Sequence, residues 1–329
     1  MNAGETIGER GNDFMKSVSV VIPAYNGREL LEKYLPPLCA ACGKSPGPVE
    51  IIVVDDASRD ETVSFLRSRY PQIRVLVNQE NIGFAATMNR GIGAATGDLV
   101  LALNTDMAVN DDLFGKPLEW FADPDVFSVT PNIVYPHNGR SQSITRLKPS
   151  FCWFQALELQ PGDIPSSEGE VPILFGSGGA SFYDREKLVR LGGFDTIYHP
   201  FYIEDIDLSY RAWKAGWKCL AELSVTVRHE SNATIRSHYW KRYIKTVSDR
   251  NRILFMWINV TDISLIVRYF LFLPLSFVKD LVLFRKYKFV GFFWALKYLP
   301  LVPAARRKRK TYFRVGDREL FRIVGPVKG

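Results

Sequence analysis

The stretch LVLALNTDMAV, residues 99–109, joins a continuously apolar run to a polar cluster. Leu99–Leu103 predicts a short strand that is covered on both faces, because a strand with one solvated face would alternate apolar and polar residues. Asn104, Thr105 and Asp106 follow at once. A carboxylate at the lip of a buried sheet costs free energy unless something pairs with it. We therefore expect a cation or a ligand at Asp106; a polar turn that caps the next element is the alternative.

Three earlier runs have the same β-branched, apolar character. Together the segments 18–23, 50–55, 73–77 and 98–103 predict a parallel sheet built from βαβ units, with helical stretches between the strands. Each run ends in polar residues, which read PAYNG, DDAS, NQENIG and NTD in chain order. Ligands of open α/β sheets bind outside the carboxyl ends of the strands. Four clusters at one edge therefore favour a binding site over four unrelated turns.

Two helix starts are also legible in this half of the chain. Ser58 followed by Glu61 predicts a capping box for a helix over residues 60–70. Gly83 is expected to open a second helix, which runs through Asn89 to about residue 95.

The phosphate-binding loops of common nucleotide sites are missing from the sequence. It has no G-x-x-x-x-G-K-[ST], and GIGAATG at 91–97 fits G-x-G-x-x-G poorly and precedes a strand instead of following one. A dinucleotide or ATP site of the usual kind is therefore not expected. Acidic residues near a diphosphate require a divalent cation between them, and Asp106 is the best-placed ligand for it.

Composition indicates a chain of 329 residues, 47% apolar, with enough core for one large α/β domain plus an appendage or for two modest domains. The four cysteines show no disulfide framework and residues 1–16 do not resemble a signal peptide, so we expect a reducing cytoplasm. Glycosylation at the acceptor patterns of Asn232 and Asn259 is discounted for the same reason. Cys39 and Cys42 form a C-x-x-C without a second pair, beside Pro36-Pro37 in what we expect to be an irregular helix, so a metal or redox site is not favoured.

Positive charge is concentrated at the C-terminal end. Residues 285–329 hold 13 Lys and Arg against 2 Asp and Glu, and they include RRKRK at 306–310. Such a run suits nucleic acid or anionic lipid, and the Phe, Leu and Trp residues before it favour lipid. The longest uncharged run after residue 231, 269–278, is shorter than the roughly 20 apolar residues of a span and contains Pro274. We predict amphipathic helices on a membrane surface, anchored by Trp257, Trp294 and the basic tail; a tilted span and a soluble helical lid or oligomer contact are the alternatives.

Seven motifs, in this order and spacing, resemble family 2 glycosyltransferases with the GT-A fold over about residues 17–231. They are VSVVIPAYN (18–26), VVDDAS (53–58), NIGFAATMN (81–89), LNTD (103–106), FGSGGASFYDREKLVRLGGFD (175–195), FYIEDIDLSYRAWKAGW (201–217) and VRHES (227–231). The resemblance implies an α/β, Rossmann-like fold with a mostly parallel sheet flanked by helices, here followed by C-terminal amphipathic helices.

In that family a D-x-D motif at a strand end holds a metal ion and a nucleotide sugar, and here it reads Asn104-Thr105-Asp106. By resemblance Asp106 keeps the role of metal ligand. Asn104 can still hydrogen-bond a ribose but supplies no charge, which implies weaker or less selective metal binding. His229 follows a predicted strand and is similar in position to a second ligand; an imidazole favours Mn²⁺ over Mg²⁺.

The resemblance also assigns a set of residues to the nucleotide sugar. Tyr25 is expected to stack on the base or, alternatively, to pack in the core, and the glycines are expected to let backbone approach the sugar or to form a tight turn. The set is Pro23, Ala24, Tyr25, Asn26, Asp55, Asp56, Asn81, Gly83, Asn89, Asn104, Thr105, Gly178 and Gly179.

The acidic segment 204–207 supplies the expected base. IDLSYRAWKAG reads as a helix that ends at Gly216, with Glu204 and Asp205 at its N-terminus, where the macrodipole favours an ionised carboxylate. The resemblance selects Asp205 as the catalytic base and gives Glu204 a part in shaping the acceptor site. Asp207 is expected to cap the helix.

The resemblance thus implies a metal-dependent transferase that inverts the anomeric configuration of the sugar. The Q-x-x-R-W motif of the family's processive synthases is missing from the sequence, so we expect the addition of a single sugar. The expected donor is a UDP- or dTDP-sugar, and the expected acceptor is a lipid-linked or cell-surface glycan, with rhamnose-type transfer a guess from the family. We expect the protein at the cytoplasmic face of the membrane, on anionic lipid and without a nucleic-acid partner. The predicted organisation is a leader (1–16), the GT-A domain (17–231), a helical membrane-associating region (232–303) and a basic tail (304–329).

Three other classes of protein are alternatives to a transferase. A non-catalytic membrane adaptor with a degenerate transferase domain is favoured only by Asn104. A sugar-nucleotide pyrophosphorylase would need a basic glycine-rich loop after the first strand, which PAYNGRE does not supply. A nucleic-acid binder would use the basic tail alone.

Overall fold

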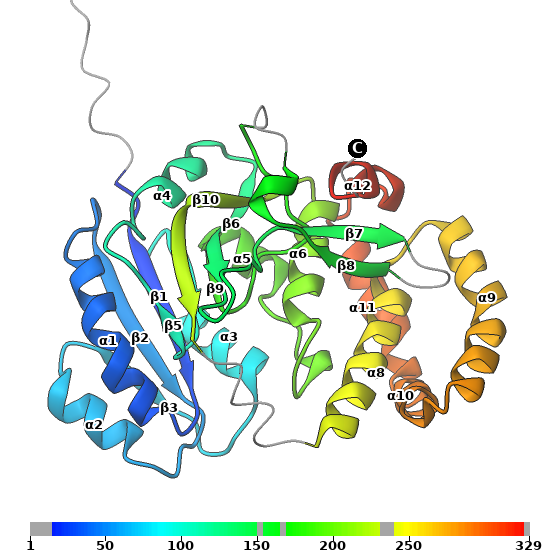
Figure 1. Cartoon of the computed structure of the whole chain (residues 1–329), viewed down its shortest axis with the longest axis horizontal. Helices are drawn as coiled ribbons and strands as arrows, with labels where there is room; N and C mark the ends of the chain where they lie inside the picture. The colour runs from blue at the N-terminus through cyan, green and yellow to red at the C-terminus, as the bar shows by residue number, and fades with distance from the viewer. Residues whose placement is uncertain (1–14, 150–153, 165–168, 231–239, 326–329) are drawn as a thin grey trace, which may run out of the picture.

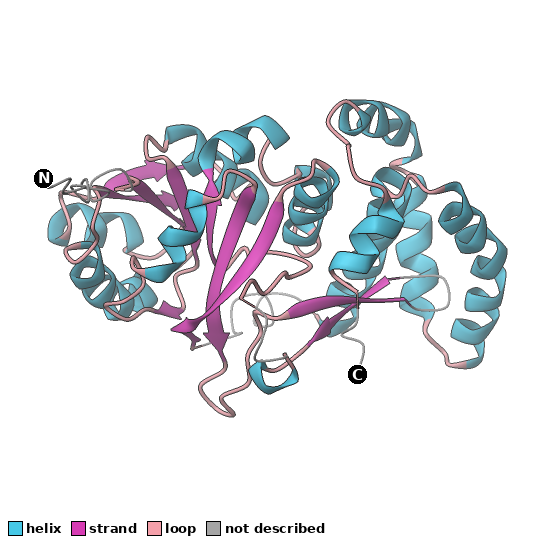
Figure 2. Ribbon diagram, turned by 90° about the horizontal axis from the view of Figure 1, so that it is seen from above, coloured by secondary structure: helices cyan, strands magenta, loops and turns pink. Residues whose placement is uncertain are grey.

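The computed structural model describes residues 15–149, 154–164, 169–230 and 240–325. A central sheet of eight strands has the order β3-β2-β1-β4-β9-β6-β10-β5. Helices cover both faces of this sheet, and a group of helices formed by the C-terminal part of the chain stands at one end of the molecule (Figures 1 and 2). The strands are β1 (Val18–Ala24), β2 (Val49–Asp55), β3 (Arg74–Val77), β4 (Leu99–Leu103), β5 (Met107–Ala108), β6 (Val126–Val134), β9 (Ala180–Asp184) and β10 (Lys218–His229).

The first four strands confirm the sequence prediction within one residue at each end. β1 pairs in parallel with β2 on one side and with β4 on the other, and β2 pairs in parallel with β3. Their apolar residues alternate between two cores, since Val20 packs on the side of α1 (Arg28–Cys42) and Val21 on the side of α3 (Phe84–Ala94). Burial on both faces is the reason that these strands are apolar throughout.

The second half of the sheet is mixed, which the sequence did not predict. β9 runs antiparallel between β4 and β6, while β10 runs parallel to β6. The two-residue strand β5 pairs antiparallel with the end of β10 and sets Met107 opposite His229. Residues 104–106 therefore cross from a central strand of the sheet to its edge. A separate hairpin joins β7 (Thr145–Pro149) to β8 (Phe154–Glu158).

Shorter helices complete the α/β part. They are α2 (Thr62–Arg69), α4 (Lys116–Glu119), α5 (Arg185–Leu191) and α6 (Glu204–Lys214), with 3-10 turns η1 (Trp120–Ala122), η2 (Pro161–Asp163) and η3 (Thr196–Tyr198).

One local prediction in this part was wrong. Ser58 and Glu61 form no capping box: α2 starts after Glu61 without a side-chain cap, and Ser58 Oγ instead accepts the Asn26 N–H at 2.8 Å. The Ser58 hydroxyl thus links the loops after β1 and β2 and does not cap α2. Helix α1 runs from Arg28 to Cys42 with Pro36 and Pro37 inside it.

The two cysteines of the C-x-x-C in α1 are partly buried. Burial raises the pKa of the Cys42 thiol to about 12, so the thiolate that metal binding or redox chemistry needs is disfavoured at neutral pH. Cys39 and Cys42 are both free thiols. This agrees with the sequence argument against a metal or redox site there.

The C-terminal helices are α8 (Lys241–Asn259), α9 (Ile263–Val282), α10 (Lys286–Leu296), η4 (Leu299–Leu301), α11 (Val302–Lys310) and α12 (Asp317–Ile323). Helix α8 packs against α10, α11 and α6, whereas α9 is the outermost helix in Figure 1. None of the helices in the described ranges combines the length and apolar character needed to cross a bilayer. The basic tail is not wholly exposed: Arg309 of α11 is buried, and Arg306 donates to the backbone carbonyl oxygens of Trp257 and Val260.

Candidate active site

Asp106 and His229 meet because β5 pairs with the end of β10. His229 Nε2 lies 3.2 Å from Asp106 Oδ2, and the two side chains are only 14% and 11% exposed. On its other side, His229 Nδ1 lies 3.4 Å from the side-chain amide of Gln142, and the imidazole stacks on Tyr135. Gln142 and Tyr135 were missed by the sequence analysis, because they lie in a loop that no motif marks.

The donor set of this pair fits a divalent cation. A carboxylate and an imidazole that lie this close together are donor types that suit Mn²⁺. No cluster of three or more His, Cys, Asp or Glu side chains that could enclose a metal occurs among the described residues. A cation held here would therefore need further ligands, and the oxygens of a bound diphosphate or water could supply them.

Two glycines join this end of the site to the acidic segment. The Asn104 N–H donates to the Gly179 carbonyl oxygen at 2.8 Å, and a Cβ placed on Gly179 would lie 3.2 Å from Asn104 Nδ2 and 2.6 Å from Met107 Cε. A Cβ placed on Gly178 would lie 3.7 Å from the Asp205 Cβ and 3.1 Å from the Phe84 ring. Both positions thus require glycine because neighbouring atoms approach closely, and neither has a left-handed backbone conformation. The backbone of 178–179 separates Asn104 from Asp205.

Asp205 and Glu204 begin α6, as the sequence analysis expected. Burial raises the pKa of both carboxyl groups, that of Glu204 to about 8 with a further contribution from the neighbouring Asp205. The N–H groups of Ile206 and Gly178 are hydrogen-bonded to Asp205 and lower its pKa in part. Glu204 Oε2 is buried without a hydrogen-bond partner. Of the two carboxyl groups, Asp205 therefore has more backbone N–H groups that stabilise its ionised form.

The loop before α6 is held by α8. Asn251 Nδ2 donates to the carbonyl oxygens of Tyr198, Phe201 and Tyr202 at 2.6, 3.0 and 3.0 Å. Tyr202 and Ile203 both have positive φ angles, 67° and 83°, a backbone conformation that costs free energy in non-glycine residues. The Asn251 amide therefore stabilises an unfavourable turn that leads directly into the acidic segment.

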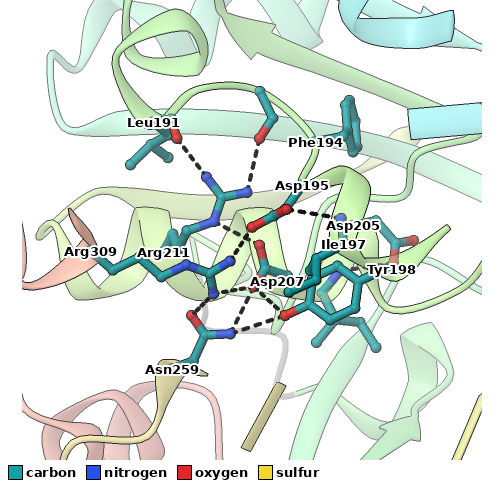
Figure 3. A network of polar contacts seen from close by, with 12 residues as sticks. Leu191, Phe194, Asp195, Ile197, Tyr198, Asp205, Asp207, Arg211, Asn259 and Arg309 are labelled. Atoms are coloured by element: carbon teal, nitrogen blue, oxygen red, sulfur yellow. Dashed lines mark hydrogen bonds and ion pairs between the residues drawn. The ribbon is translucent and has the colours of Figure 1, made fainter. Parts of the chain in front are cut away.

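Asp207 does not cap α6, which corrects the prediction. It is fully buried and its carboxylate pairs with Arg211 at 2.7 Å and with Arg309 at 2.6 Å (Figure 3). Tyr198 and Asn259 also donate to it, each at 2.7 Å. Burial opposes its ionisation, but the two arginines outweigh burial and lower the pKa of Asp207 to about 2. Since Asn259 is buried in this network, its acceptor pattern for glycosylation is inaccessible.

The polar residues after β1 and β2 organise neighbouring loops. Asp56 accepts hydrogen bonds from the Ile82 and Gly83 N–H groups at 2.9 Å, which shapes the loop before α3. Asp55 Oδ2 accepts the Ser58 N–H at 3.0 Å, and its Oδ1 is buried without a partner. Asp55 is thus the carboxylate of the pair that retains an oxygen for a ligand.

The remaining predicted donor-site residues lie along the same strand edge, with one exception. Pro23 and Ala24 end β1; Tyr25 and Asn26 follow it, and Asn26 Oδ1 accepts the Arg59 N–H. Asn81 is exposed and Thr105 partly buried. The exception is Asn89, whose amide is used on both sides by the Phe194 backbone, at 2.7 and 2.9 Å, and so ties α3 to residue 194.

A contact that no motif indicated closes the site near Gly83. A Cβ placed on Gly83 would lie 2.7 Å from the His199 Nδ1, and Gly83 itself has a φ of 80°. His199, which the sequence analysis set aside, therefore brings the loop before α6 against the loop before α3.

The family model named "Glycosyl transferase family 2" matches residues 19–192, more than half of the chain. The chain belongs to this family. It is therefore a family 2 glycosyltransferase, and its α/β sheet with flanking helices is the GT-A fold that its motifs predicted.

Relatives and solved structures agree with this membership. The chain is 29% identical over 240 residues to the N-acetylglucosaminyl-diphospho-decaprenol L-rhamnosyltransferase of Mycobacterium tuberculosis, a match that spans 64% of this chain and 75% of the relative. It is 40% identical over 98 residues to the undecaprenyl-phosphate 4-deoxy-4-formamido-L-arabinose transferase of Serratia proteamaculans, which spans 28% of this chain and 30% of the relative. The fold is similar to that of GalNAc-T7 with UDP, GalNAc and Mn²⁺, with a TM-score of 0.59 at 17% identity, over 75% of this chain and 48% of that one.

Proposed function

We propose that this glycosyltransferase is metal-dependent and inverting, and moves a single sugar from a UDP- or dTDP-sugar to a lipid-linked or cell-surface glycan acceptor. One observation carries the proposal. The Asp106–His229 pair and the Asp205 carboxylate lie on either side of the Asn104–Gly179–Gly178 contacts. Transfer from a nucleoside diphosphate requires positive charge near the diphosphate and a base near the acceptor hydroxyl. The proposed cation-binding pair and the proposed base lie on the two sides of the 178–179 backbone, which suits this requirement.

The residues divide the chemistry between them. Asp205 accepts the proton of the acceptor hydroxyl as that oxygen attacks the anomeric carbon, while Glu204 helps to shape the acceptor site. Asp106 and His229 would hold the divalent cation, and a cation bound there would supply positive charge against the diphosphate. Asp55, Asn104 and the loop after β1 take the base and ribose of the donor.

The names of the relatives support the acceptor class. The rhamnosyltransferase and the arabinose transferase are both named for polyprenyl-linked substrates. We propose that this chain uses an acceptor of the same kind from the cytoplasmic face of a membrane, resting on anionic lipid rather than on nucleic acid. Rhamnose is the proposed sugar, on the likeness to the rhamnosyltransferase.

Nucleotide-dependent thermal stability tests the donor and metal parts of the proposal. The protein is heated with UDP, dTDP, GDP or CMP, each with and without Mn²⁺, as wild type and as Asp106→Ala. A nucleotide at 100 times its Kd stabilises by about 2.7 kcal/mol, which raises Tm by several degrees. We expect a shift with UDP or dTDP that needs Mn²⁺ and is lost in Asp106→Ala. The exposed Asp112, a few residues further along the chain, provides the matched control Asp112→Ala, which should keep the shift.

The other outcomes are equally informative. A full shift without metal would contradict metal dependence, and a shift with GDP or CMP alone would contradict the proposed donor. No shift with any nucleotide would favour the adaptor alternative, in which Asn104 marks a lost site.

A further inference from the structure

The outward face of α9 is apolar along the whole helix. Its exposed side chains recur every three to four residues, so they form one stripe rather than scattered positions. Leu271 is 67% exposed and Val278 is 61% exposed. The stripe, which we name the α9 face, consists of Ile263, Val267, Phe270, Leu271, Leu275, Val278, Leu281 and Val282, and it continues into Leu283 and Phe284.

Packing of α9 against the rest of the protein does not explain why its exposed side is apolar. Only Tyr269, Leu273 and Asp280 of the helix are buried, the first two in a small cluster with Met256 and Val260 of the α8 end. A surface helix normally turns its apolar stripe toward the core. Soluble monomers rarely expose a continuous apolar stripe of this length, and such a surface marks an interaction site.

The charges around the α9 face select the partner. Between residues 263 and 301 the sole acidic residue is Asp280, which is buried and pairs with Lys288 at 3.2 Å. The exposed charges of this segment are all positive, namely Arg268, Lys279, Lys286 and Lys297. Apolar residues rimmed by Lys and Arg bind the interface of an anionic bilayer, where the apolar side chains enter the acyl boundary and the cations meet the head groups.

The structure also turns two arginines of the RRKRK run toward the protein interior, while Arg307, Lys308 and Lys310 stay exposed. Arg309 forms ion pairs with Asp207 and Asp195, and Arg306 donates hydrogen bonds to backbone carbonyl oxygens. These two side chains therefore face inward. The sequence prediction treated this run as a membrane-facing tail; for Arg306 and Arg309 that was wrong.

We propose that the α9 face is the membrane-docking surface of this protein and that its partner is an anionic lipid leaflet. This proposal deepens the proposed function. It rests on that function in one respect, namely that a lipid-linked acceptor gives the enzyme a reason to dock on a membrane. Docking through α9 also orients the active site. Asp317 of α12 accepts from the N–H groups of Thr261 and Asp262 before α9 and pairs with Lys214 of α6, so the helix that bears Asp205 is tied to the start of α9.

Vesicle co-sedimentation of the full chain tests the proposal. Wild type is mixed with phosphatidylcholine vesicles and with vesicles that contain phosphatidylglycerol, over a series of salt concentrations. The double variant Leu271→Glu/Val278→Glu removes apolar contact, and Arg268→Gln/Lys279→Gln removes charge at the rim of the same helix. Val189 is 54% exposed on α5, so Val189→Glu is a matched control.

We expect wild type and Val189→Glu to bind the anionic vesicles, less so as salt rises. The glutamate double variant should lose at least ten-fold in apparent affinity, and the glutamine double variant should lose a smaller factor. Melting of each variant with nucleotide and Mn²⁺ separates this proposal from the proposed function, because a docking defect leaves the nucleotide shift unchanged. Equal vesicle binding by wild type and the glutamate variant would overturn the proposal. So would a wild-type dimer that this variant converts to a monomer, since a second copy would then cover the face.

Discussion

At the scale of single residues, two adjacent carboxyl groups differ by their hydrogen bonds. Asp205 is supported by the N–H groups of Ile206 and Gly178, whereas Glu204 Oε2 is buried without a partner. Burial raises the pKa of Glu204 to about 8, which favours the protonated form of this carboxyl group near neutral pH. Neighbouring carboxyls whose environments separate their pKa values are suited to different roles in one reaction. Here they fit a base and an acceptor-binding acid.

The first prediction concerns the base. Asp205→Asn should lower kcat by a factor of about 10²–10⁴, the usual contribution of general base catalysis, because the amide cannot accept the proton. Nucleotide- and Mn²⁺-dependent stabilisation should remain, since Asp205 is not a proposed metal ligand. Steady-state kinetics with the identified donor, beside thermal unfolding, measure both. A variant with wild-type kcat would show that another group is the base.

The second prediction concerns Glu204 and pH. Its pKa is raised on folding from 4.5 to about 8, so between these values the folded state holds a proton that the unfolded state has released. The free energy of unfolding should therefore fall as pH rises through this window. Glu204→Gln should flatten that part of the profile, as measured by urea unfolding from pH 5 to pH 8. An unchanged slope in the variant would mean that Glu204 is ionised in the folded protein.

At the scale of elements, the register of α3 on the sheet depends on one glycine. A Cβ placed on Gly91 would lie 2.2 Å from Val21 Cγ1 and 3.0 Å from Val54 Cγ2, so the helix approaches β1 and β2 as closely as a backbone without side chain allows. Gly93 in the same helix has no atom within 4 Å of such a Cβ. The two positions thus differ in packing while sharing helix and residue type.

The third prediction uses this pair. Gly91→Ala should destabilise the protein by about 1–3 kcal/mol, the usual cost of an overpacked core. Gly93→Ala should stabilise it by up to about 1 kcal/mol through helix propensity. Chemical denaturation of both variants measures the difference. Equal effects of the two substitutions would show that α3 shifts freely on the sheet.

At the scale of the whole molecule, the C-terminal helices are part of the support of the active site. Asn251 of α8 holds the loop before the acidic segment, and Arg309 of α11 pairs with Asp207 two residues after the proposed base. Both contacts join residues far apart in the chain. The boundary between a GT-A domain at 17–231 and a separate helical region remains a prediction. Buried contacts such as these two join the residues on its two sides.

The fourth prediction follows from this integration. Arg309→Gln leaves the buried Asp207 with a single arginine and should cost about 3–5 kcal/mol, the cost of breaking a buried ion pair. Arg307→Gln, in the same helix but exposed, should change stability by no more than about 0.5 kcal/mol. Thermal and chemical unfolding of the two variants measure this. Similar small effects would mean that the tail is only loosely attached to α6.

The sequence by itself determined the parallel half of the sheet, the start of α6 at Glu204 and the family. These features depend on local signals. Strands buried on both faces must be apolar throughout, and the residues near a helix end indicate where the helix begins or stops. Tertiary structure alone decided the mixed half of the sheet, the partners of Asp207 and the inward direction of Arg309. Charge pairs between distant residues leave no periodic trace, so a buried arginine and a solvated one look alike in a basic run. The meeting of Asp106 with His229 likewise follows from a two-residue strand, which is too short to show any pattern before the chain has folded.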